Sequence, residues 1–227
     1  MSADKVVEWD AAGRVLDARS WCVARAGGDV AAGLAYFAAQ QGAYLPRREG
    51  FEDLWEHGRR FVYGAVNAGG MGTEGRFGPF CIVIADPEAQ SPKALAVFPG
   101  DSAQRYTTAD GGVDAAAAEA EATAWRERAA LAVVHHSSEA TGADPGRWGE
   151  VVCRRDHYLE VVVAGHLPVS IVDEVRLRGT LVDRLDELES RRFLGEALAA
   201  DEDNEVRAYR ALQRWRQASG TTIAAVA

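Results

Sequence analysis

The chain has 227 residues, of which 48% are hydrophobic and 26% charged, and its formal net charge is −9. This composition is typical of a folded globular protein and argues against extended disorder away from the ends. The acidic balance argues against a non-specific grip on nucleic acid, because such binding needs Lys and Arg to neutralise phosphates.

The cysteine and hydropathy patterns predict a cytoplasmic protein. Cys22, Cys81 and Cys153 are widely spaced, odd in number and form no CxxC pair, so neither a disulfide framework nor a zinc site is expected. The first residues lack the apolar core of a signal peptide. No run approaches the roughly 18 apolar residues that a membrane span requires, so we expect no membrane segment.

Two helices are predicted in the first third of the chain. Asp29 is a candidate N-cap for a helix over residues 30–44. A second helix is expected over 51–67, where apolar residues recur at helical spacing. The β-rich run Phe61-Val62-Tyr63 leaves the end of that helix open.

Short strands and a long helix are predicted next. A glycine-rich loop over 69–78 precedes a strand at 80–84, and further strands are expected at 95–98 and 105–108. A long Ala/Glu/Arg-rich helix is expected to follow Asp114 and to extend through Leu131.

The last third is predicted to hold one strong strand and then helices. The strand spans 158–164, and a helical turn is expected over 171–177. Residues 181–227 are expected to be helical throughout, as a hairpin with an amphipathic stripe. The apolar residues of that stripe are Leu181, Leu185, Leu188, Phe193 and Leu198.

Together these elements predict an α/β (α+β) protein, with a mixed, split β-sheet flanked by helices. Residues 1–180 are expected to form the core domain, and 181–227 a C-terminal helical extension packed on it. Such a hairpin caps the core, or its stripe serves as a surface for a homodimer or a protein partner.

The glycine loop contains Gly70-Met71-Gly72-Thr73-Glu74-Gly75, a literal GxGxxG. In a dinucleotide-binding fold this pattern leaves a strand and opens a helix. Here the predicted order is helix, loop and strand, so a Rossmann-type role is not expected.

The histidines do not predict a metal site. His135 and His136 are adjacent, so on a helix they point about 100° apart and cannot easily share one ion. His157 and His166 lie in other segments, without a ligand spacing such as HExxH. We therefore expect buried or solvent-facing histidines and no metal.

Glu160 is the most unusual residue of the strand at 158–164. Side chains alternate along a strand, so Tyr158, Glu160 and Val162 share one face. A carboxylate among apolar neighbours costs on the order of several kcal/mol if it is desolvated and unpaired. Glu160 must therefore face water, meet an arginine, or line a cleft as a catalytic group.

The segment from Tyr158 to Val175 resembles a late strand of bacterial ADP-ribosyltransferase-fold proteins, including DNA-modifying toxins. In that family a catalytic Glu begins a hydrophobic strand, which a turn and a short helix follow. The resemblance implies a split sheet that clasps NAD, with the family's glutamate at Glu160. The family's early Arg or His motif has no clear counterpart, and Tyr106-Thr107-Thr108 matches its Ser-Thr-Ser strand only distantly.

The resemblance implies an NAD-dependent ADP-ribosyltransferase or NAD glycohydrolase, with NAD as substrate and no metal. The Glu160 carboxylate would stabilise the oxocarbenium-like centre formed when nicotinamide leaves. By residue type, Arg76 is a candidate to bind the pyrophosphate and Tyr106 to stack on nicotinamide. Two alternatives remain: a non-catalytic interaction or immunity-type protein that uses the C-terminal helices, and another small-molecule enzyme with its site at the glycine loop.

Overall fold

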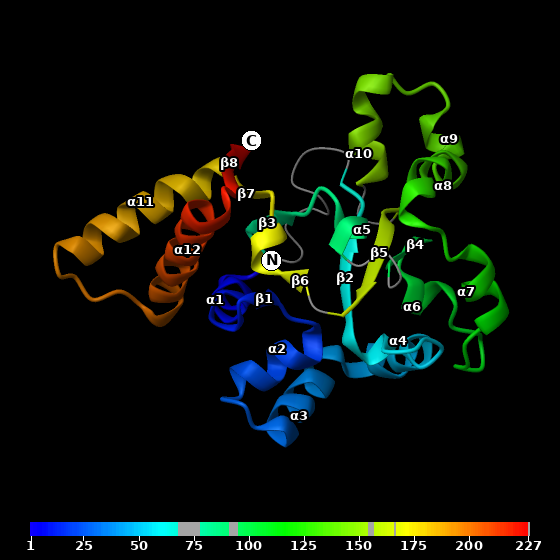
Figure 1. Cartoon of the computed structure of the whole chain (residues 1–227), viewed down its shortest axis with the longest axis horizontal. Coiled ribbons are helices and arrows are strands. Elements are labelled where there is room, and N and C mark those ends of the chain that lie inside the picture. The colour runs from blue at the N-terminus through cyan, green and yellow to red at the C-terminus, as the bar shows by residue number, and fades with distance from the viewer. Residues whose placement is uncertain (68–77, 91–94, 154–156, 166, 227) are drawn as a thin grey trace. The chain divides into compact units, whose positions relative to one another are not determined.

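The computed structural model describes residues 1–67, 78–90, 95–153, 157–165 and 167–226. Helices and open sheets are mixed in it, which confirms the α/β class (Figure 1). Contacts divide the chain into two compact units. Unit 1 comprises Met1–Val15, Glu74–Asp86 and Leu167–Ala227, and unit 2 comprises Leu16–Thr73 and Pro87–His166.

Unit 2 is built on a three-stranded antiparallel sheet of order β2-β5-β4. Its strands are β2 (Phe61–Ala65), β4 (Leu95–Pro99) and the central β5 (Leu159–Ala164). Its α-helices are α2 (Ala18–Arg25), α3 (Val30–Gln41), α4 (Leu45–Glu52), α5 (Pro87–Gln90), α6 (Ser102–Arg105), α7 (Ala115–Glu121), α8 (Arg128–His135), α9 (Ser137–Ala140) and α10 (Trp148–Val152). Short 3-10 turns are η1 (Gly42–Tyr44), η2 (Gly58–Arg60), η3 (Trp125–Glu127) and η4 (Pro145–Arg147).

Both faces of the central strand β5 are buried, and one of them carries an aromatic-rich cluster. In the strand register Glu160 lies opposite Ala65 on one side and Phe98 on the other. Directly paired residues point to the same face, so Glu160 shares its face with Phe98 and, two positions along β5, with Val162. Phe98 and Val162 belong to a buried cluster that also contains Phe51 of α4. Glu160 is therefore directed to the face that carries this cluster.

Unit 1 has a mixed sheet of order β3-β7-β8, in which β3 and β7 are antiparallel and β7 and β8 parallel. A parallel pair needs a long crossover, and here α11 and α12 supply it. The strands are β3 (Phe80–Val83), β7 (Glu174–Arg178), β8 (Thr222–Val226) and the paired β1 (Arg14–Val15) and β6 (Leu167–Pro168). The helices are α1 (Ala3–Ala12), α11 (Gly179–Phe193), α12 (Ala200–Ser219) and the 3-10 turn η5 (Val169–Ile171).

The two long helices of unit 1 belong to its core. Val6 of α1, Leu185 of α11 and Leu212 of α12 are each 0% exposed and lie in one cluster with residues of β3 and β7. Ion pairs join α11 to α12, among them Arg184–Glu205 at 2.8 Å and Arg210–Glu189 at 2.6 Å. The division by contacts thus has other boundaries than the predicted one at residue 180. None of the described helices combines the length and apolarity that crossing a membrane would take.

Several predicted elements are confirmed. Asp29 caps α3 by accepting a hydrogen bond from the Ala32 amide at 3.0 Å. Asp114 likewise caps α7 through the Ala117 amide at 2.9 Å. The strands predicted at 80–84, 95–98 and 158–164 correspond to β3, β4 and β5.

The helix predicted over 51–67 is wrong. Helix α4 ends at Glu52, and the β-rich run Phe61-Val62-Tyr63 forms β2 instead. Pairing with β5 satisfies the backbone of this run, so a tertiary contact overrides the helical spacing of its apolar residues.

Other boundaries are corrected for similar reasons. The strand predicted at 105–108 is replaced by the end of α6 and an isolated bridge from Thr107 to Val113. The long helix after Asp114 breaks at Ala122, because Thr123 pairs with Val97 of β4. The segment predicted as helix over 171–177 contains β7, and the C-terminal helix gives way to strand β8.

Candidate functional site

Glu160 is a buried carboxylate on the central strand of unit 2. It is the second residue of β5, and only 6% of it is exposed. Its cross-strand neighbours Ala65 and Phe98 are apolar. Every residue of β5 is buried, and the alternation of side chains places this carboxylate on the face of Phe98 and Val162.

Ser102, the first residue of α6, holds one oxygen of this carboxylate. Its backbone amide donates a hydrogen bond to Oε2 of Glu160 at 2.9 Å, and its Oγ donates a second bond to the same oxygen. The described residues donate no hydrogen bond to Oε1. Among the described residues, the carboxylate is thus anchored through one oxygen.

A tight turn after β4 brings Ser102 to this place. Gly100 has φ +80°, a left-handed conformation that glycine adopts without strain. Its amide donates to the Tyr158 carbonyl at 2.8 Å, which ties the turn to the start of β5. Asp101 then caps α6 by accepting from the Gln104 amide at 2.9 Å.

A second carboxylate and a tyrosine complete this cluster. The hydroxyl of Tyr44 donates to Oδ1 of Asp101 at 2.6 Å. Burial, followed by the bond to Asp101, raises the pKa of Tyr44 above its ordinary value, so the phenol keeps its proton. We call Tyr44, Asp101, Ser102 and Glu160 the Glu160 cluster.

Burial raises the pKa of Glu160 to about 7, because the charged form loses its hydration. The two hydrogen bonds from Ser102 act in the opposite direction, and the charge of Asp101 raises the pKa further. Arg48 lowers it as a more distant positive charge. This carboxyl therefore holds its proton to a higher pH than an ordinary glutamate does.

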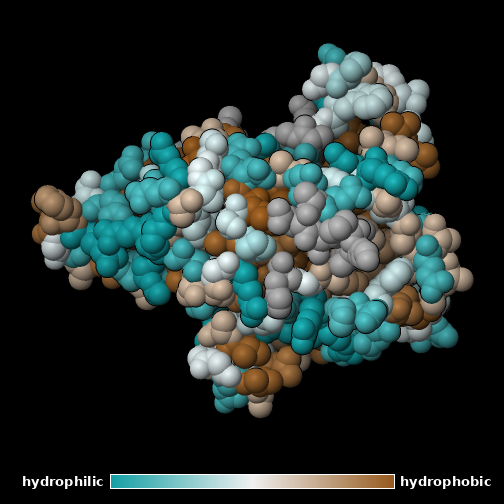
Figure 2. All heavy atoms as spheres, in the orientation of Figure 1, coloured by the Kyte–Doolittle hydropathy of each residue, from teal (hydrophilic) through white to brown (hydrophobic). Residues whose placement is uncertain are grey.

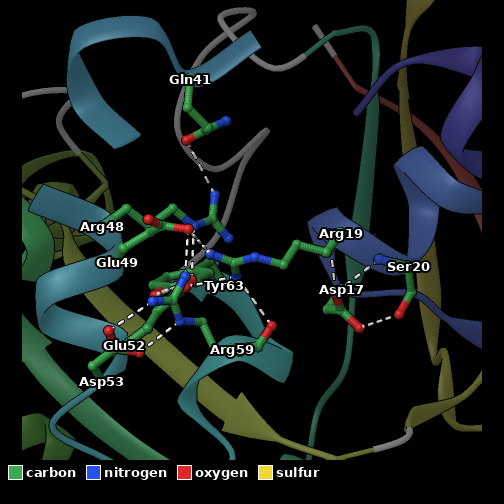
Figure 3. Close-up of polar contacts among 10 residues, drawn as sticks. All are labelled: Asp17, Arg19, Ser20, Gln41, Arg48, Glu49, Glu52, Asp53, Arg59 and Tyr63. Carbon is green, nitrogen blue, oxygen red and sulfur yellow. Dashed lines mark hydrogen bonds and ion pairs between the residues drawn. The ribbon is translucent and has the colours of Figure 1, made fainter. Parts of the chain in front are cut away.

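The second buried carboxylate of unit 2, Glu52, has a different environment. It is 0% exposed, and it makes ion pairs with Arg19 (Nη1 to Oε2, 2.6 Å) and Arg48 (Nε to Oε1, 2.8 Å). Tyr63 donates a further hydrogen bond to its Oε1 at 3.1 Å. Figure 3 shows both guanidinium groups directed at this carboxylate, with the Arg59–Asp53 pair beside them. Glu52 is thus a compensated, structural charge.

Tyr106 lies in the core of unit 2. It is 3% exposed, and its ring is stacked on that of Phe51, with centroids 6.0 Å apart and planes at 16°. Its hydroxyl donates to Oε2 of Glu121 at 2.8 Å, not to Glu160. The stacking partner observed for Tyr106 is therefore a core phenylalanine.

Arg76 and the whole GxGxxG run lie outside the described residues. Of the three predicted site residues, Glu160 and Tyr106 are therefore the two that can be placed, both in unit 2. Asp101, Ser102 and Tyr44 were missed. The sequence did carry one signal for them, since Gly100-Asp101-Ser102 directly follows a predicted strand and reads as a turn with a helix cap.

The carboxyl and hydroxyl groups of the Glu160 cluster are suited to transfer a proton and to stabilise a positive charge. Across the part of the chain that the structure describes, no three His, Cys, Asp or Glu side chains are grouped closely enough to hold a metal ion.

Comparisons with known proteins identify no relative. No family model matches the chain, and the searches of curated proteins and of solved structures gave no significant match either. Function is accordingly inferred from the geometry of the Glu160 cluster and of the exposed surface of unit 1.

Proposed function

We propose that this protein cleaves the bond between nicotinamide and ribose in NAD, as an ADP-ribosyltransferase or NAD glycohydrolase, with Glu160 as the catalytic carboxylate. The observation that carries the proposal is the contrast between two buried acids of one unit. Glu52 makes ion pairs with two arginines, whereas Glu160 makes none with the described residues. The resemblance of Tyr158–Val175 to the family's catalytic strand selects NAD as substrate.

An uncompensated buried carboxylate weakens the fold, so stability alone does not account for it. Active sites are the usual place for such a group, because its perturbed pKa is useful there. Glu160 combines that perturbation with a fixed position, since Ser102 anchors Oε2. Its Oε1 is the atom we assign to the substrate.

In the proposed reaction the N-glycosidic bond breaks, and its electron pair goes to the nicotinamide nitrogen. Oε1 of Glu160 accepts a hydrogen bond from a ribose hydroxyl, and the negative charge stabilises the positive ribose centre. Water or an acceptor hydroxyl then adds to the ribose carbon and loses its proton. The proposal requires that NAD binding opens access to a residue that is 6% exposed.

The test is release of free nicotinamide from NAD by the purified full chain and by Glu160→Gln. Loss of the charge should lower the rate by roughly 100-fold or more. Glu121→Gln is the matched control, because Glu121 is a carboxylate of the same unit that is paired with Arg105 near the surface. It should retain the wild-type rate. The proposal would be refuted if wild type and Glu160→Gln released nicotinamide at equal rates, or if wild type released none above the buffer control.

A second candidate function, a protein-interaction role, is supported by the end of α11. Phe193 is 90% exposed and Leu194 72% exposed, and together with Glu189 and Ser190 they line a shallow hollow. Figure 2 shows hydrophobic atoms, in brown, where α11 ends. Large exposed apolar side chains that lie together are typical of binding surfaces.

The rest of the predicted stripe is not available to a partner. Leu181, Leu185 and Leu188 are at most 7% exposed, because they pack inside unit 1. A truncation after residue 180 would therefore remove part of the core. The informative variant is Phe193→Ser with Leu194→Ser, compared with wild type by light scattering over a range of concentrations. A homodimer through this surface predicts a concentration-dependent mass that the variant loses, and a monomeric wild type would exclude it.

A further inference from the structure

Three histidines of unit 2 meet where α8 ends, and we call them the histidine corner. The rings of His135 and His136 are 4.8 Å apart between centroids, and those of His135 and His157 are 6.2 Å apart. His135 is the last residue of α8, His136 follows it, and His157 precedes β5. The ring of His135 thus lies between those of two other histidines.

His135 is poorly placed to carry a positive charge. Its Nε2 is buried and accepts or donates no hydrogen bond among the described residues. Arg105 of α6 and His157 both act on it as positive neighbours. Burial, followed by these two groups, lowers the pKa of His135 below its ordinary value.

The acidic groups near this corner are already engaged. Glu121, at the end of α7, accepts from Arg105 Nε at 2.7 Å and from the Tyr106 hydroxyl at 2.8 Å. Glu139 of α9 accepts from Ser138 Oγ at 2.6 Å. Both attract a charged His135, but neither is hydrogen-bonded to it. A proton on His135 would therefore be held without a direct counter-ion.

We infer that the histidine corner is an acid-sensitive latch, which keeps α8 packed against α9 and β4 at neutral pH and loosens α8 when His135 becomes protonated. Helix α8 contacts both α9 and β4, so the corner lies at a junction of these elements. A proton binds His135 more weakly in the folded state than in the unfolded one. The contribution of His135 to the free energy of unfolding is therefore fully present above the ordinary imidazole pKa of about 6.5. It is lost as the pH falls below that value.

The test compares thermal unfolding of the full chain at pH 7.5 and 5.5 for wild type, His135→Gln and His57→Asn. His57 is an exposed histidine of the same unit with φ +63°, a conformation that asparagine tolerates, so it is a matched control. We expect the fall in Tm between the two pH values to be smaller by roughly 3 °C or more in His135→Gln, and unchanged in His57→Asn. Amide hydrogen exchange, read by mass spectrometry on peptides of α8, gives a local signal for its release.

Should His135→Gln fail to fold, His157→Gln answers the same question, because His157 is exposed and its loss removes a positive neighbour of His135. It should also reduce the acid sensitivity. Differences between each variant and wild type isolate the imidazoles, since every other titrating group is common to both. An identical fall in Tm for wild type and for the folded corner variants would overturn the inference. So would protection of the α8 amides, corrected for the intrinsic exchange rate, that is the same at pH 7.5 and 5.5.

Discussion

Replacing Glu160 with glutamine should stabilise unit 2, and increasingly so as the pH rises. The pKa of Glu160 is raised from its ordinary 4.5 to about 7 by burial. The unfolded chain therefore releases this proton at lower pH than the folded chain does. The free energy of unfolding therefore falls as the pH rises from 4.5 to 7, and the total decrease is about 3 kcal/mol.

The amide introduced by Glu160→Gln would keep the acceptor for Ser102 and remove the charge. Between pH 5 and pH 8 the free energy of unfolding of this variant should therefore rise by roughly 2–3 kcal/mol relative to wild type. Urea denaturation at both pH values measures this, and Trp55, whose ring contacts Phe51 and Phe98, reports on unit 2.

Glu121→Gln serves as the control, because Glu121 is paired with Arg105 and its pKa is lowered. The free energy of unfolding of this variant should not rise relative to wild type between pH 5 and pH 8. If the free energies of unfolding of wild type and Glu160→Gln differ by the same amount at pH 5 and pH 8, Glu160 is not an uncompensated buried acid.

Three further outcomes are expected. Arg48→Met should destabilise unit 2 by about 3 kcal/mol in urea denaturation, because it removes one of the two cations paired with buried Glu52; a loss as small as that of an exposed pair would contradict this. Gly100→Ala should cost about 1 kcal/mol or more, because φ +80° is strained for alanine, and an unchanged Tm would show that the turn can rearrange. Leu185→Ala should cost about 2–5 kcal/mol, because the side chain is 0% exposed, whereas Phe193→Ala, at 90% exposure, should leave the Tm of unit 1 unchanged.

The sequence predicted those helices and strands that depend mainly on neighbouring residues. The caps at Asp29 and Asp114 and the strands at 80–84, 95–98 and 158–164 follow from propensity and periodicity. Residues 61–65 and 222–226 were misread because their strands exist only by pairing with β5 and β7. Such distant partners cannot be read from a window of neighbouring residues.

The candidate site was predictable in one part. Alternation along β5 placed Glu160 with Val162, and both share the face of Phe98. Its contact with Ser102 joins residues 58 positions apart, which spacing alone cannot reveal. Tyr106 was proposed for stacking by residue type, but residue type does not say whether a ring faces a ligand or a phenylalanine.

The segments of unit 1 are far apart in the chain, and this has a consequence for biosynthesis. Asp10 of α1 accepts hydrogen bonds from Trp215 and Arg214 of α12, about two hundred positions later. At ribosomal speeds of roughly 5–20 residues per second, α1 waits about 10–40 s for that partner. Nearly all of unit 2 emerges within this interval and can fold first. The apolar face of α1 around Val6 is thus exposed to chaperones or to aggregation until α12 has been synthesised.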